Sequence, residues 1–590
     1  MDPLILLVPL VAATAAVAIN RNYRFSKYLA LAGSLASLAL FSLVGGGASS
    51  FGWLAIGSTV VDITTATAAV NIVLMLSVLL ISPAVLLYSF GSEGLPSGQK
   101  KFYLEMLALE AAMLAFSMSG GFALFFIGWA FISLTSYVSI FFHNTDQKAN
   151  RAARKTATVA AIGDLALLGA MAIVLNVYGT LDFSGVFGSL AATPMPLTAV
   201  ALLTLAILAK AAQFPFHEWL PDALEGPAPF AAFLSSGTAV KAGLFAAIIL
   251  FPIFYASGAL PVLFFLGLVT AVIGTLNALT EKRVKRVLAY STVQGLGLAL
   301  MAVGSGSLAA AVYFLFAQGF YMSLLFLCAG ISAKATGKEN LDEMGGLAQN
   351  KTVYLAAAVG VLSLAGLVPF SGFFANMGMA SALGGDLAAY AIISLISLTT
   401  SVYCTRWLVL QAKKTGKSGA SLNYRTVPRS MMAGAALLAA GALLAGAGFF
   451  ILPGYVGAGA QGATQSSLQI TTYGAAFETG AVAVGVGIGY YVYARRKRPS
   501  ARAAAANPDR SGFLTMIANA AFSYAAAFVM LLGDGFNYFD AEANGMFDGL
   551  GHFVMKFANS AKRLASREIS AYVVVFAVGM LLLLIALAII

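Results

Sequence analysis

The chain has 590 residues, of which 60% are apolar and only 10% are charged, whereas soluble globular proteins average about 45–50% and about 25%. Together with a mean hydropathy of +0.88, this composition excludes a soluble enzyme and predicts a protein that crosses the membrane many times. The net charge of +11 is expected to reflect basic loops at a membrane surface and not a nucleic-acid partner.

Apolar stretches long enough to cross the bilayer recur from one end of the chain to the other. Because every backbone amide must be paired inside hydrocarbon, such stretches cross only as helices. The predicted fold class is therefore an all-α polytopic membrane protein with about 16 transmembrane helices. No basic segment precedes the first stretch, which we interpret as a retained helix and not a cleaved signal. The stretches fall at residues 3–20, 27–45, 65–90, 102–118, 121–142, 156–178, 194–215, 228–253, 258–280, 286–303, 307–332, 352–375, 387–411, 430–452, 473–494 and 570–589.

Basic residues are divided sharply between alternate connections. The even-numbered connections, such as 46–64 and 179–192, contain no Lys or Arg. Because cytoplasmic loops carry an excess of Lys and Arg, this pattern predicts a multi-pass protein of the cell membrane with its N-terminus outside and its odd-numbered connections in the cytoplasm. The basic connections are 21–27, 99–101, 147–155, 281–286, 334–351, 413–429 and 495–502.

A few charged residues lie inside the predicted spans. Each costs about 2.5–3.5 kcal/mol on insertion scales, so it is expected to be paired, hydrated or functional. Glu105 lies close to the basic edge formed by Lys100 and Lys101, and an interfacial position is an alternative for it. The candidates for a proton pathway are Lys210, Lys241, Glu110, Asp164 and Glu105.

Lys210 is the candidate that is hardest to explain as structural. It lies deep in the seventh span and five residues before Pro215. A proline breaks the helix and leaves carbonyl groups without their usual partners. A broken helix beside a buried charge is typical of ion sites in transporters. The alternative that Lys210 only caps the freed carbonyl groups stays open.

Lys241 also lies deep in its own span, with no carboxylate near it in the sequence. We expect its partner to be a polar residue or a file of water molecules shared with Lys210. Residues 216–227, which follow the seventh span, contain His217, Glu218 and Asp222. This segment is typical of an interfacial turn, and a metal site is the weaker interpretation because one histidine and scattered carboxylates lack a ligand geometry.

The cysteines and histidines argue against a redox centre in this chain. Two cysteines, Cys328 and Cys404, are too few for the four thiolates of an iron–sulfur cluster. The three histidines, His143, His217 and His552, lie in separate segments, so no pair is placed to ligate a haem. We expect no cofactor, and we leave open whether the chain is part of an enzyme.

Four segments resemble the proton-conducting membrane transporter family. They are AKAAQFPFHEWLPDALEGPAPFAAFLSSGTAVKAG (209–243), EKRVKRVLAYSTVQGLG (281–297), YFLFAQGFYMSLLFLCAG (313–330) and GLVPFSGFFAN (366–376). This family includes the antiporter-like subunits of respiratory complex I, related hydrogenases and multisubunit sodium/proton antiporters. The resemblance extends over about residues 65–410 and implies that the partners are other membrane subunits, the lipid bilayer, and protons or sodium ions.

The resemblance also implies a domain organisation. Two inverted five-helix repeats, spans four to eight and nine to thirteen, would each contain a broken helix, with Pro215 in the seventh span and Pro369 in the twelfth. The tail at 511–569 and the last span resemble the lateral helix and anchor of the largest, L-type subunit of complex I. An ordinary amphipathic tail is the alternative. The expected divisions are 1–100, 101–255, 256–412, 413–510 and 511–590.

Position by position, the resemblance carries over in the first repeat and fails in the second. Lys210 and Lys241 match lysines of the family, and Asp164 resembles an acidic residue of many L-type subunits. Other positions depart from it: Ala130 stands where relatives have a glutamate, and Asn376 where they have a lysine or glutamate. In the eleventh span, Phe314, Gln318 and Met322 stand where L-type relatives show two histidines and a lysine.

These departures suggest a partial proton pathway. In the family a glutamate–lysine pair is thought to pass protons toward the eleventh span and out through the second repeat. Here the second repeat has no titratable group at the matched positions, and we hypothesise that Glu110 replaces the glutamate missing at Ala130. Three functions stay open: a subunit of a complex-I-like translocase of the NADH-quinone oxidoreductase type, an ion-transporting subunit of another energy-coupled complex, and a structural subunit.

Overall fold

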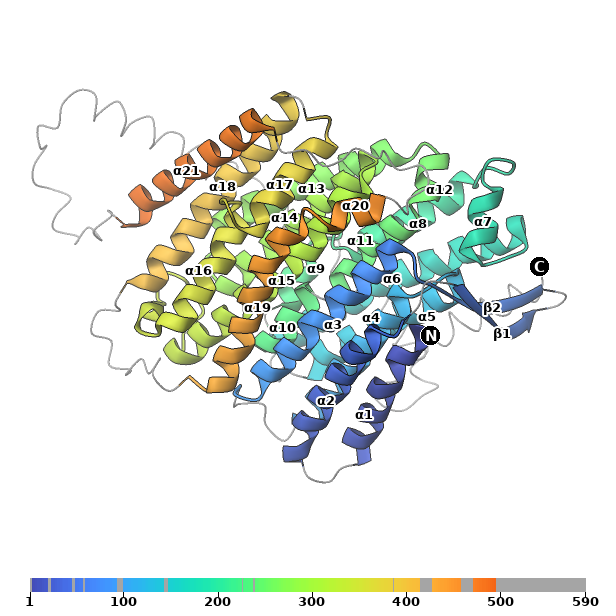
Figure 1. The fold of residues 1–590 in the computed structure, drawn as a ribbon, viewed down its shortest axis with the longest axis horizontal. Coiled ribbons are helices and arrows are strands. Elements are labelled where there is room, and N and C mark those ends of the chain that lie inside the picture. The colour runs from blue at the N-terminus through green and yellow to red at the C-terminus, as the bar shows by residue number, and fades with distance from the viewer. Residues whose placement is uncertain are drawn as a thin grey trace, which may run out of the picture.

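The computed structural model describes residues 3–19, 23–44, 48–56, 59–92, 99–142, 147–224, 226–236, 239–385, 387–413, 427–457 and 471–494. Within these ranges the chain forms a bundle of helices with one small β-hairpin (Figure 1). Among the described residues there are ten helical spans long and apolar enough to cross a membrane, one of which comprises α10 and α11, and shorter apolar helices accompany them. The prediction of a polytopic helical membrane protein is confirmed. The predicted span 570–589 and the predicted lateral helix 511–569 lie outside the described residues.

The described helices follow the first fifteen predicted stretches. In chain order the first half contains η1 (Pro3–Leu6), α1 (Leu7–Ile19), α2 (Tyr23–Phe41), α3 (Ala69–Ser89), α4 (Gln99–Ser117), α5 (Phe122–Phe142), α6 (Gln147–Tyr178), α7 (Phe183–Ser189), α8 (Leu197–Lys210), α9 (Trp219–Ala223), α10 (Ala228–Ser236) and α11 (Ala239–Ile249). The second half contains α12 (Phe251–Ala256), α13 (Leu260–Thr280), α14 (Val284–Gly304), α15 (Leu308–Thr336), η2 (Leu347–Gln349), α16 (Lys351–Ala365), α17 (Ser371–Ala382), α18 (Leu387–Ala412), α19 (Arg429–Gly448), α20 (Leu452–Gly457) and α21 (Thr472–Ala494).

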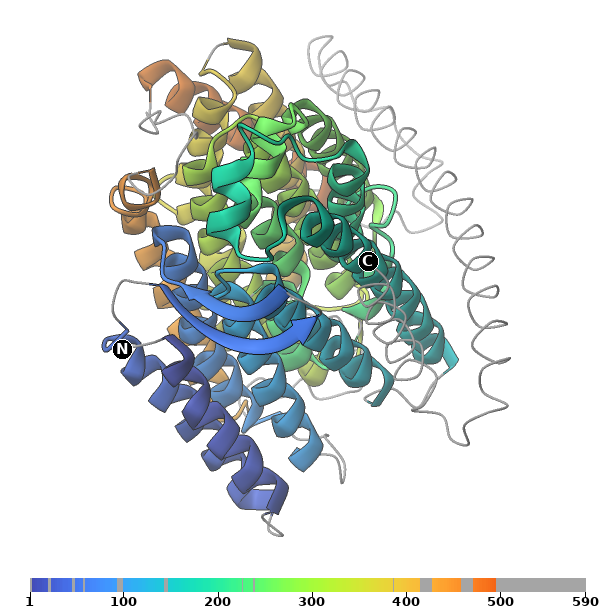
Figure 2. The ribbon, with the colours of Figure 1, turned by 90° about the vertical axis from the view of Figure 1, so that its right-hand side faces the viewer.

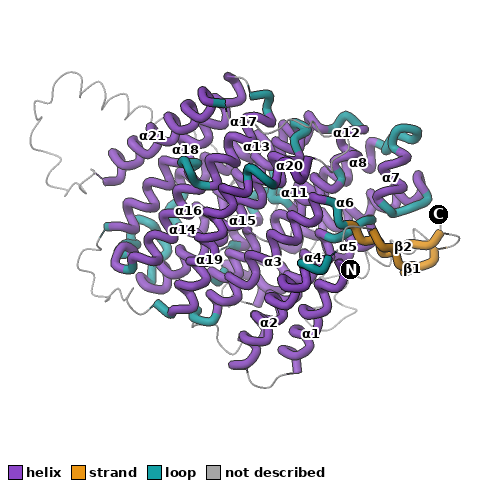
Figure 3. Tube along the Cα trace, viewed as in Figure 1, coloured by secondary structure: helices purple, strands orange, loops and turns teal. Residues whose placement is uncertain are grey.

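The connection between α2 and α3 forms an antiparallel β-hairpin, which the helical interpretation did not predict (Figure 3). Strand β1 (Ala48–Ile56) pairs with β2 (Thr59–Ala66), and β2 is rich in the β-branched residues that favour strands. The hairpin lies against two other connections free of Lys and Arg. The Thr64 hydroxyl donates to an Asp182 carboxylate oxygen at 2.9 Å, and Thr65 forms a β-bridge with Ser119. Figure 2 shows the hairpin crossing the end of the helices beneath it.

Several of the basic connections lie together at one end of the bundle. Asp222 on α9 joins the N-terminal parts of α6 and α14, because it pairs with Lys155 at 3.2 Å and with Arg286 at 2.7 Å. Backbone hydrogen bonds extend the chain of contacts from Lys282 to Leu341 and from Gly346 to Lys413. The alternation of basic and non-basic connections thus corresponds to two ends of the folded bundle.

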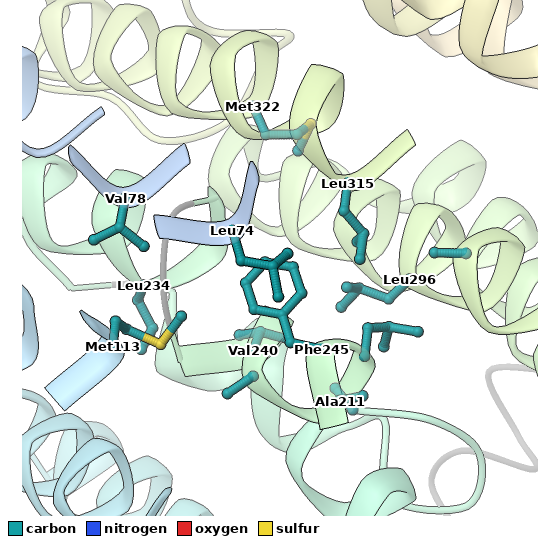
Figure 4. Packing of buried hydrophobic residues seen from close by; sticks show 14 of the residues in the cluster. Leu74, Val78, Met113, Ala211, Leu234, Val240, Phe245, Leu296, Leu315 and Met322 are labelled. Carbon is teal, nitrogen blue, oxygen red and sulfur yellow. The ribbon is translucent and has the colours of Figure 1, made fainter. Parts of the chain in front are cut away.

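The core of the bundle lies around α14 and α15. In the most apolar stretch of α14 and of α15, 94% of the residues are buried, whereas in α21 the corresponding share is 22%. Helix α21 lies at the periphery beside α18 (Figure 1). Because neighbours surround α15 on all sides, it needs no polar face and carries apolar residues throughout. Figure 4 shows apolar side chains of α3, α11, α14 and α15 that gather in this core, among them Leu74, Phe245, Leu296 and Leu315.

Two helices are broken where the sequence predicts. The seventh span ends as α8 at Lys210 and resumes as α9 at Trp219, and the twelfth is divided between α16 and α17. Pro215 and Pro369 lie in these gaps, each after a cis peptide bond. A proline has no amide hydrogen and cannot continue the hydrogen-bonded ladder, which explains why both helices stop.

The two breaks have the same backbone geometry. Three residues before each proline, Ala212 and Gly366 both adopt a positive φ, of 48° and 77°. The hydrogen bond from the Gln213 amide to the Leu208 carbonyl has its counterpart between Leu367 and Leu362. This correspondence supports the prediction of two related halves, with one break in each.

Candidate functional site

Lys210 ends α8 at the first break, and its side chain is 5% exposed. The ammonium group donates to the Ser133 hydroxyl at 2.5 Å and to the Trp129 carbonyl at 2.9 Å, both on α5. It also lies 4.8 Å from the centre of the Trp129 ring, within range of a cation–π interaction. The lysine is therefore buried but held by polar groups of a neighbouring helix.

The carboxylate of this site is Asp164, on α6. One of its oxygens accepts hydrogen bonds from the Ser133 hydroxyl at 2.8 Å and from the Trp129 indole N–H at 2.7 Å. Ser133 thus contacts both Asp164 and Lys210, and the opposite charges of the two residues attract each other. Asp164 is 4% exposed, so little water screens this attraction.

The carbonyl groups freed by the break have other partners. The Trp219 indole N–H donates to the Ala209 carbonyl at 3.0 Å, and the Gln213 amide side chain donates to the Ala211 carbonyl at 3.0 Å. Lys210 instead reaches across to α5. The interpretation of Lys210 as a cap for the broken helix is therefore wrong, because other side chains fill that role.

Lys241 on α11 is 2% exposed and forms a separate contact. Its ammonium group donates to the Leu315 carbonyl, in the N-terminal third of α15, at 2.6 Å. This partner is a backbone carbonyl, and a file of water molecules shared with Lys210 stays a prediction. Lys241 joins the first half of the chain to α15, the helix that carries Phe314, Gln318 and Met322.

Glu110 belongs to a third network. It is fully buried on α4, where its two carboxylate oxygens accept hydrogen bonds from Ser34 at 2.7 Å and from Ser82 at 2.5 Å. These serines lie on α2 and α3, whereas Lys210 bonds to α5. Asp164 is thus the carboxylate that Ser133 joins to Lys210, and the replacement of the missing glutamate by Glu110 stays a hypothesis. A role for Glu110 in a proton pathway stays a prediction.

Glu105 lies on α4 near the basic edge of the sequence, as expected. It is 7% exposed and interacts electrostatically with Lys101, one turn away. Ala130, where relatives have a glutamate, is buried next to Trp129 on α5. The backbone at this position is therefore close to Lys210, although the side chain carries no charge.

In the second half, Asn376 forms hydrogen bonds with polar side chains of two other helices. Its side-chain amide donates to the Ser397 hydroxyl at 2.9 Å and to a carboxylate oxygen of Glu478 at 2.7 Å. Glu478 lies on α21 and is fully buried. The matched positions of the second repeat carry no titratable group, but a helix outside that repeat brings a buried carboxylate to Asn376.

The segment with His217, Glu218 and Asp222 forms part of a charged network with the basic connections. Besides the ion pairs of Asp222, Glu218 lies 3.8 Å from Lys155 and accepts a hydrogen bond from Tyr290 at 3.0 Å. Within the part of the chain that the structure describes, no group of three or more His, Cys, Asp or Glu residues could hold a metal ion. Glu218 and Asp222 therefore tie this segment to the basic end of the bundle.

The comparison with protein families identifies the segment that contains both breaks. Residues 119–402 match the family described as NADH:quinone oxidoreductase/Mrp antiporter, TM. This segment resembles that transmembrane family. It includes Asp164, Lys210, Lys241 and Asn376, whereas Glu110 and Glu478 lie outside it.

Individual relatives of this chain come from two kinds of complex. NADH-ubiquinone oxidoreductase chain 5 of Cryptococcus neoformans is 33% identical over 356 residues, which are 58% of this chain and 53% of that protein. One of the Na(+)/H(+) antiporter subunits of Alkalihalophilus pseudofirmus is 31% identical over 361 residues, which are 55% of this chain and 45% of that protein. The chain thus spans about half the length of the curated relatives it matches.

A solved structure shares the fold. The Mrp complex from a Dietzia species has a chain that superposes with a TM-score of 0.72 and 22% sequence identity. The superposition covers 95% of this chain and 63% of that chain. The similarity in fold therefore extends well beyond residues 119–402.

Proposed function

We propose that this chain is an antiporter-like, proton-translocating membrane subunit of a multisubunit complex, of the complex I type. The observation that carries the proposal is the buried Asp164–Ser133–Lys210 arrangement at the first helix break. A lysine and a carboxylate joined through one hydroxyl, in a site that excludes most water, can exchange a proton with little movement of heavy atoms.

The resemblance of the sequence to the L-type subunit and the relatives named as chain 5 of NADH-ubiquinone oxidoreductase support the complex I type. In such a complex this chain would carry protons while redox chemistry takes place in other subunits, because the sequence provides no ligand set for a redox centre. Its partners would be other membrane subunits. The two halves at 101–255 and 256–412 would form the translocating unit, with the helices of 1–100 and 413–510 around it.

Membership of a sodium/proton antiporter complex is the second candidate. The 31% identity to the Na(+)/H(+) antiporter protein of Alkalihalophilus pseudofirmus favours it. The two candidates differ in the driving reaction and in whether sodium exchanges for protons, and they share the same proton site. Vesicles containing the purified complex distinguish them, since quinone reduction drives proton movement in the first case and a sodium gradient drives it in the second.

The sidedness of the chain is part of the proposal. We place the end of the bundle that carries Lys155, Arg286 and Lys413 in the cytoplasm, and the β-hairpin on the opposite side. The excess of basic residues in cytoplasmic loops supports this orientation. Labelling of a single cysteine introduced at Lys338, which is exposed at the basic end, tests it in sealed vesicles.

Replacement of Lys210 tests the proposed function. The assembled complex is purified through this chain and reconstituted into vesicles, and proton entry driven by a potassium diffusion potential is followed with a pH-sensitive dye inside. Lys210→Met should lower the rate by about 10²-fold, because the positioned proton-transfer group is removed. Lys338→Met, at an exposed lysine, is the matched control and should leave the rate unchanged. Equal rates for wild type and Lys210→Met contradict the proposal.

A further inference from the structure

Glu478 is a buried carboxylate that no matched motif of the sequence contains. It is the only charged residue of α21, and its side chain is 0% exposed. One oxygen, Oε1, accepts hydrogen bonds from Ser397 at 2.6 Å and from Asn376 at 2.7 Å. The other oxygen, Oε2, accepts one longer bond, from Ser394 at 3.2 Å. Oε1 is therefore the oxygen to which Ser397 can pass a proton.

The carboxylate lies at the second helix break. Gly366, in the gap between α16 and α17, has a positive φ of 77°, and a Cβ atom added to it would come 3.0 Å from Glu478 Oε1. The same atom would come 2.6 Å from the Asn376 amide nitrogen. The first break presents Lys210 as its ionisable group, and the second presents Glu478.

A polar cavity adjoins this site. Asn376 and Ser397 line it together with Gln294, Gln318 and Thr400, and its volume is about 20 Å³ for the centre of a water-sized sphere. A cavity of this size holds at least one water molecule. Gln318 is 1% exposed, and its side-chain oxygen has no hydrogen-bond partner among the described residues. A water molecule in the cavity would satisfy that oxygen.

The groups that face Glu478 from neighbouring helices are neutral. Asn376 comes from α17, and Ser394 and Ser397 come from α18. The charged residue of α18, Arg406, donates to the Glu281 carbonyl. The charged residue of α16, Lys351, lies at the start of that helix, whereas the break follows its end. The hydroxyl groups of Tyr313, which donates to the Ser371 carbonyl, and of Tyr321, which lines the cavity, belong to the same region, and Glu478 is the carboxylate at this break.

We propose that Glu478 is the proton-binding residue of the second half and takes over the role of the residue that relatives place at Asn376; this rests on the proposed function. Ser397 lines the cavity and donates to Glu478, so it is the relay. Its hydroxyl gives its proton to Oε1 of the Glu478 carboxylate and receives one from a hydronium ion in the cavity, which is left as a neutral water molecule. Release of the proton restores the carboxylate, and Asn376 holds it in place.

The test compares Glu478→Gln with the wild-type complex in the vesicle assay of proton entry described above. Glutamine keeps an oxygen that accepts from Asn376 and Ser397 but cannot take up a proton. We expect a rate lowered by about tenfold or more. The double variant Glu478→Gln/Asn376→Glu moves the carboxylate from position 478 to its hydrogen-bond partner at position 376, where relatives have an ionisable residue. It should recover most of the rate. Co-purification of the partner subunits checks assembly of each variant.

Infrared difference spectra between acidic and alkaline pH distinguish proton binding by Glu478 from a purely structural role. If the role were structural, substitution of Glu478 would leave the carboxylic acid band unchanged. The band of a protonated carboxylic acid should lose one component in Glu478→Gln and regain it in the double variant. An unchanged rate in Glu478→Gln, with Lys210→Met still slow, overturns this inference and leaves the proposed function intact. A slow Glu478→Gln variant that the double variant does not rescue, with an unchanged carboxylic acid band, also overturns it. Full rates in both Lys210→Met and Glu478→Gln overturn the proposed function as well.

Discussion

Asp164 and Lys210 share a single hydroxyl group, that of Ser133, which donates to the carboxylate at 2.8 Å and accepts from the ammonium at 2.5 Å. The three residues come from α6, α8 and α5, so the arrangement depends on how these helices pack. The indole of Trp129 supports it from one side by donating to Asp164 and covering Lys210. A proton can therefore pass between the two charged groups through one intermediate oxygen.

Removal of that hydroxyl should separate the two charged groups. In Ser133→Ala, Asp164 loses one of its donors and Lys210 loses one acceptor, so proton entry into vesicles should fall by about tenfold or more. Thr135→Val on the same helix is the matched control, because the Thr135 hydroxyl bonds to the carbonyl of Phe131 in its own helix. Ser133→Thr keeps a hydroxyl and should recover much of the rate. Equal rates for Ser133→Ala and Thr135→Val would show that the hydroxyl is not a relay.

The charged network at the basic end should make stability depend on pH through Glu281. Burial alone would raise the pKa of Glu281, but hydrogen bonds from the backbone amides of Arg283 and Lys282 and the charge of Arg286 outweigh it and hold the pKa below its ordinary value. A carboxyl group whose pKa falls on folding stabilises the folded state above its unfolded pKa. The stabilisation is lost as the pH falls through the lower, folded pKa.

Glu281→Gln should therefore lower the thermal unfolding temperature of the detergent-solubilised protein at neutral pH. The difference from wild type should shrink as the pH falls below about 4, the ordinary range of a glutamate. Glu343→Gln, at an exposed ion pair with Lys338, is the control and should have a smaller effect at neutral pH because solvent screens that pair. A difference between Glu281→Gln and wild type that stays constant across this pH range would mean that the carboxylate charge does not contribute.

The two helix breaks should respond in opposite ways to exchange of alanine and glycine. Gly366→Ala places a side chain at a positive φ and against Asn376 and Glu478, and should cost about 1–2 kcal/mol from the backbone alone. Ala212→Gly relieves the same backbone conformation at the first break and should be neutral or stabilising. Thermal unfolding of both variants under one condition tests the pair. A stabilised Gly366→Ala variant would contradict the equivalence of the breaks.

The sequence was sufficient to predict the helical membrane fold and both breaks, because hydrophobic length and proline act locally along the chain. Lys210 and Asp164 were recognised for the same reason, as charges in apolar stretches. The sequence could not show that Ser133 joins them, since this depends on the rotation of α5 about its axis. Nor could it show that Glu110 points to Ser34 and Ser82, because α4 is apolar on nearly all sides.

Glu478 was the main residue that sequence reasoning missed. It lies near the start of a predicted span, where a charged residue is expected to lie at the membrane interface. It also follows Asn376 by about a hundred positions in the chain. Only the packing of α21 against α18 brings it to the second break. The rule that an acidic residue within an apolar stretch marks a functional site would have singled it out. The β-hairpin was missed because connections were judged by their charge alone.

A double-mutant cycle of Asp164→Asn and Lys210→Met tests the central claim most directly. If the two residues form one proton-exchanging unit, each single variant should slow proton entry into vesicles strongly, and the double variant should be about as slow as the slower single variant. Effects that multiply in the double variant, or a Lys210→Met complex that takes up protons at the wild-type rate, would contradict the account.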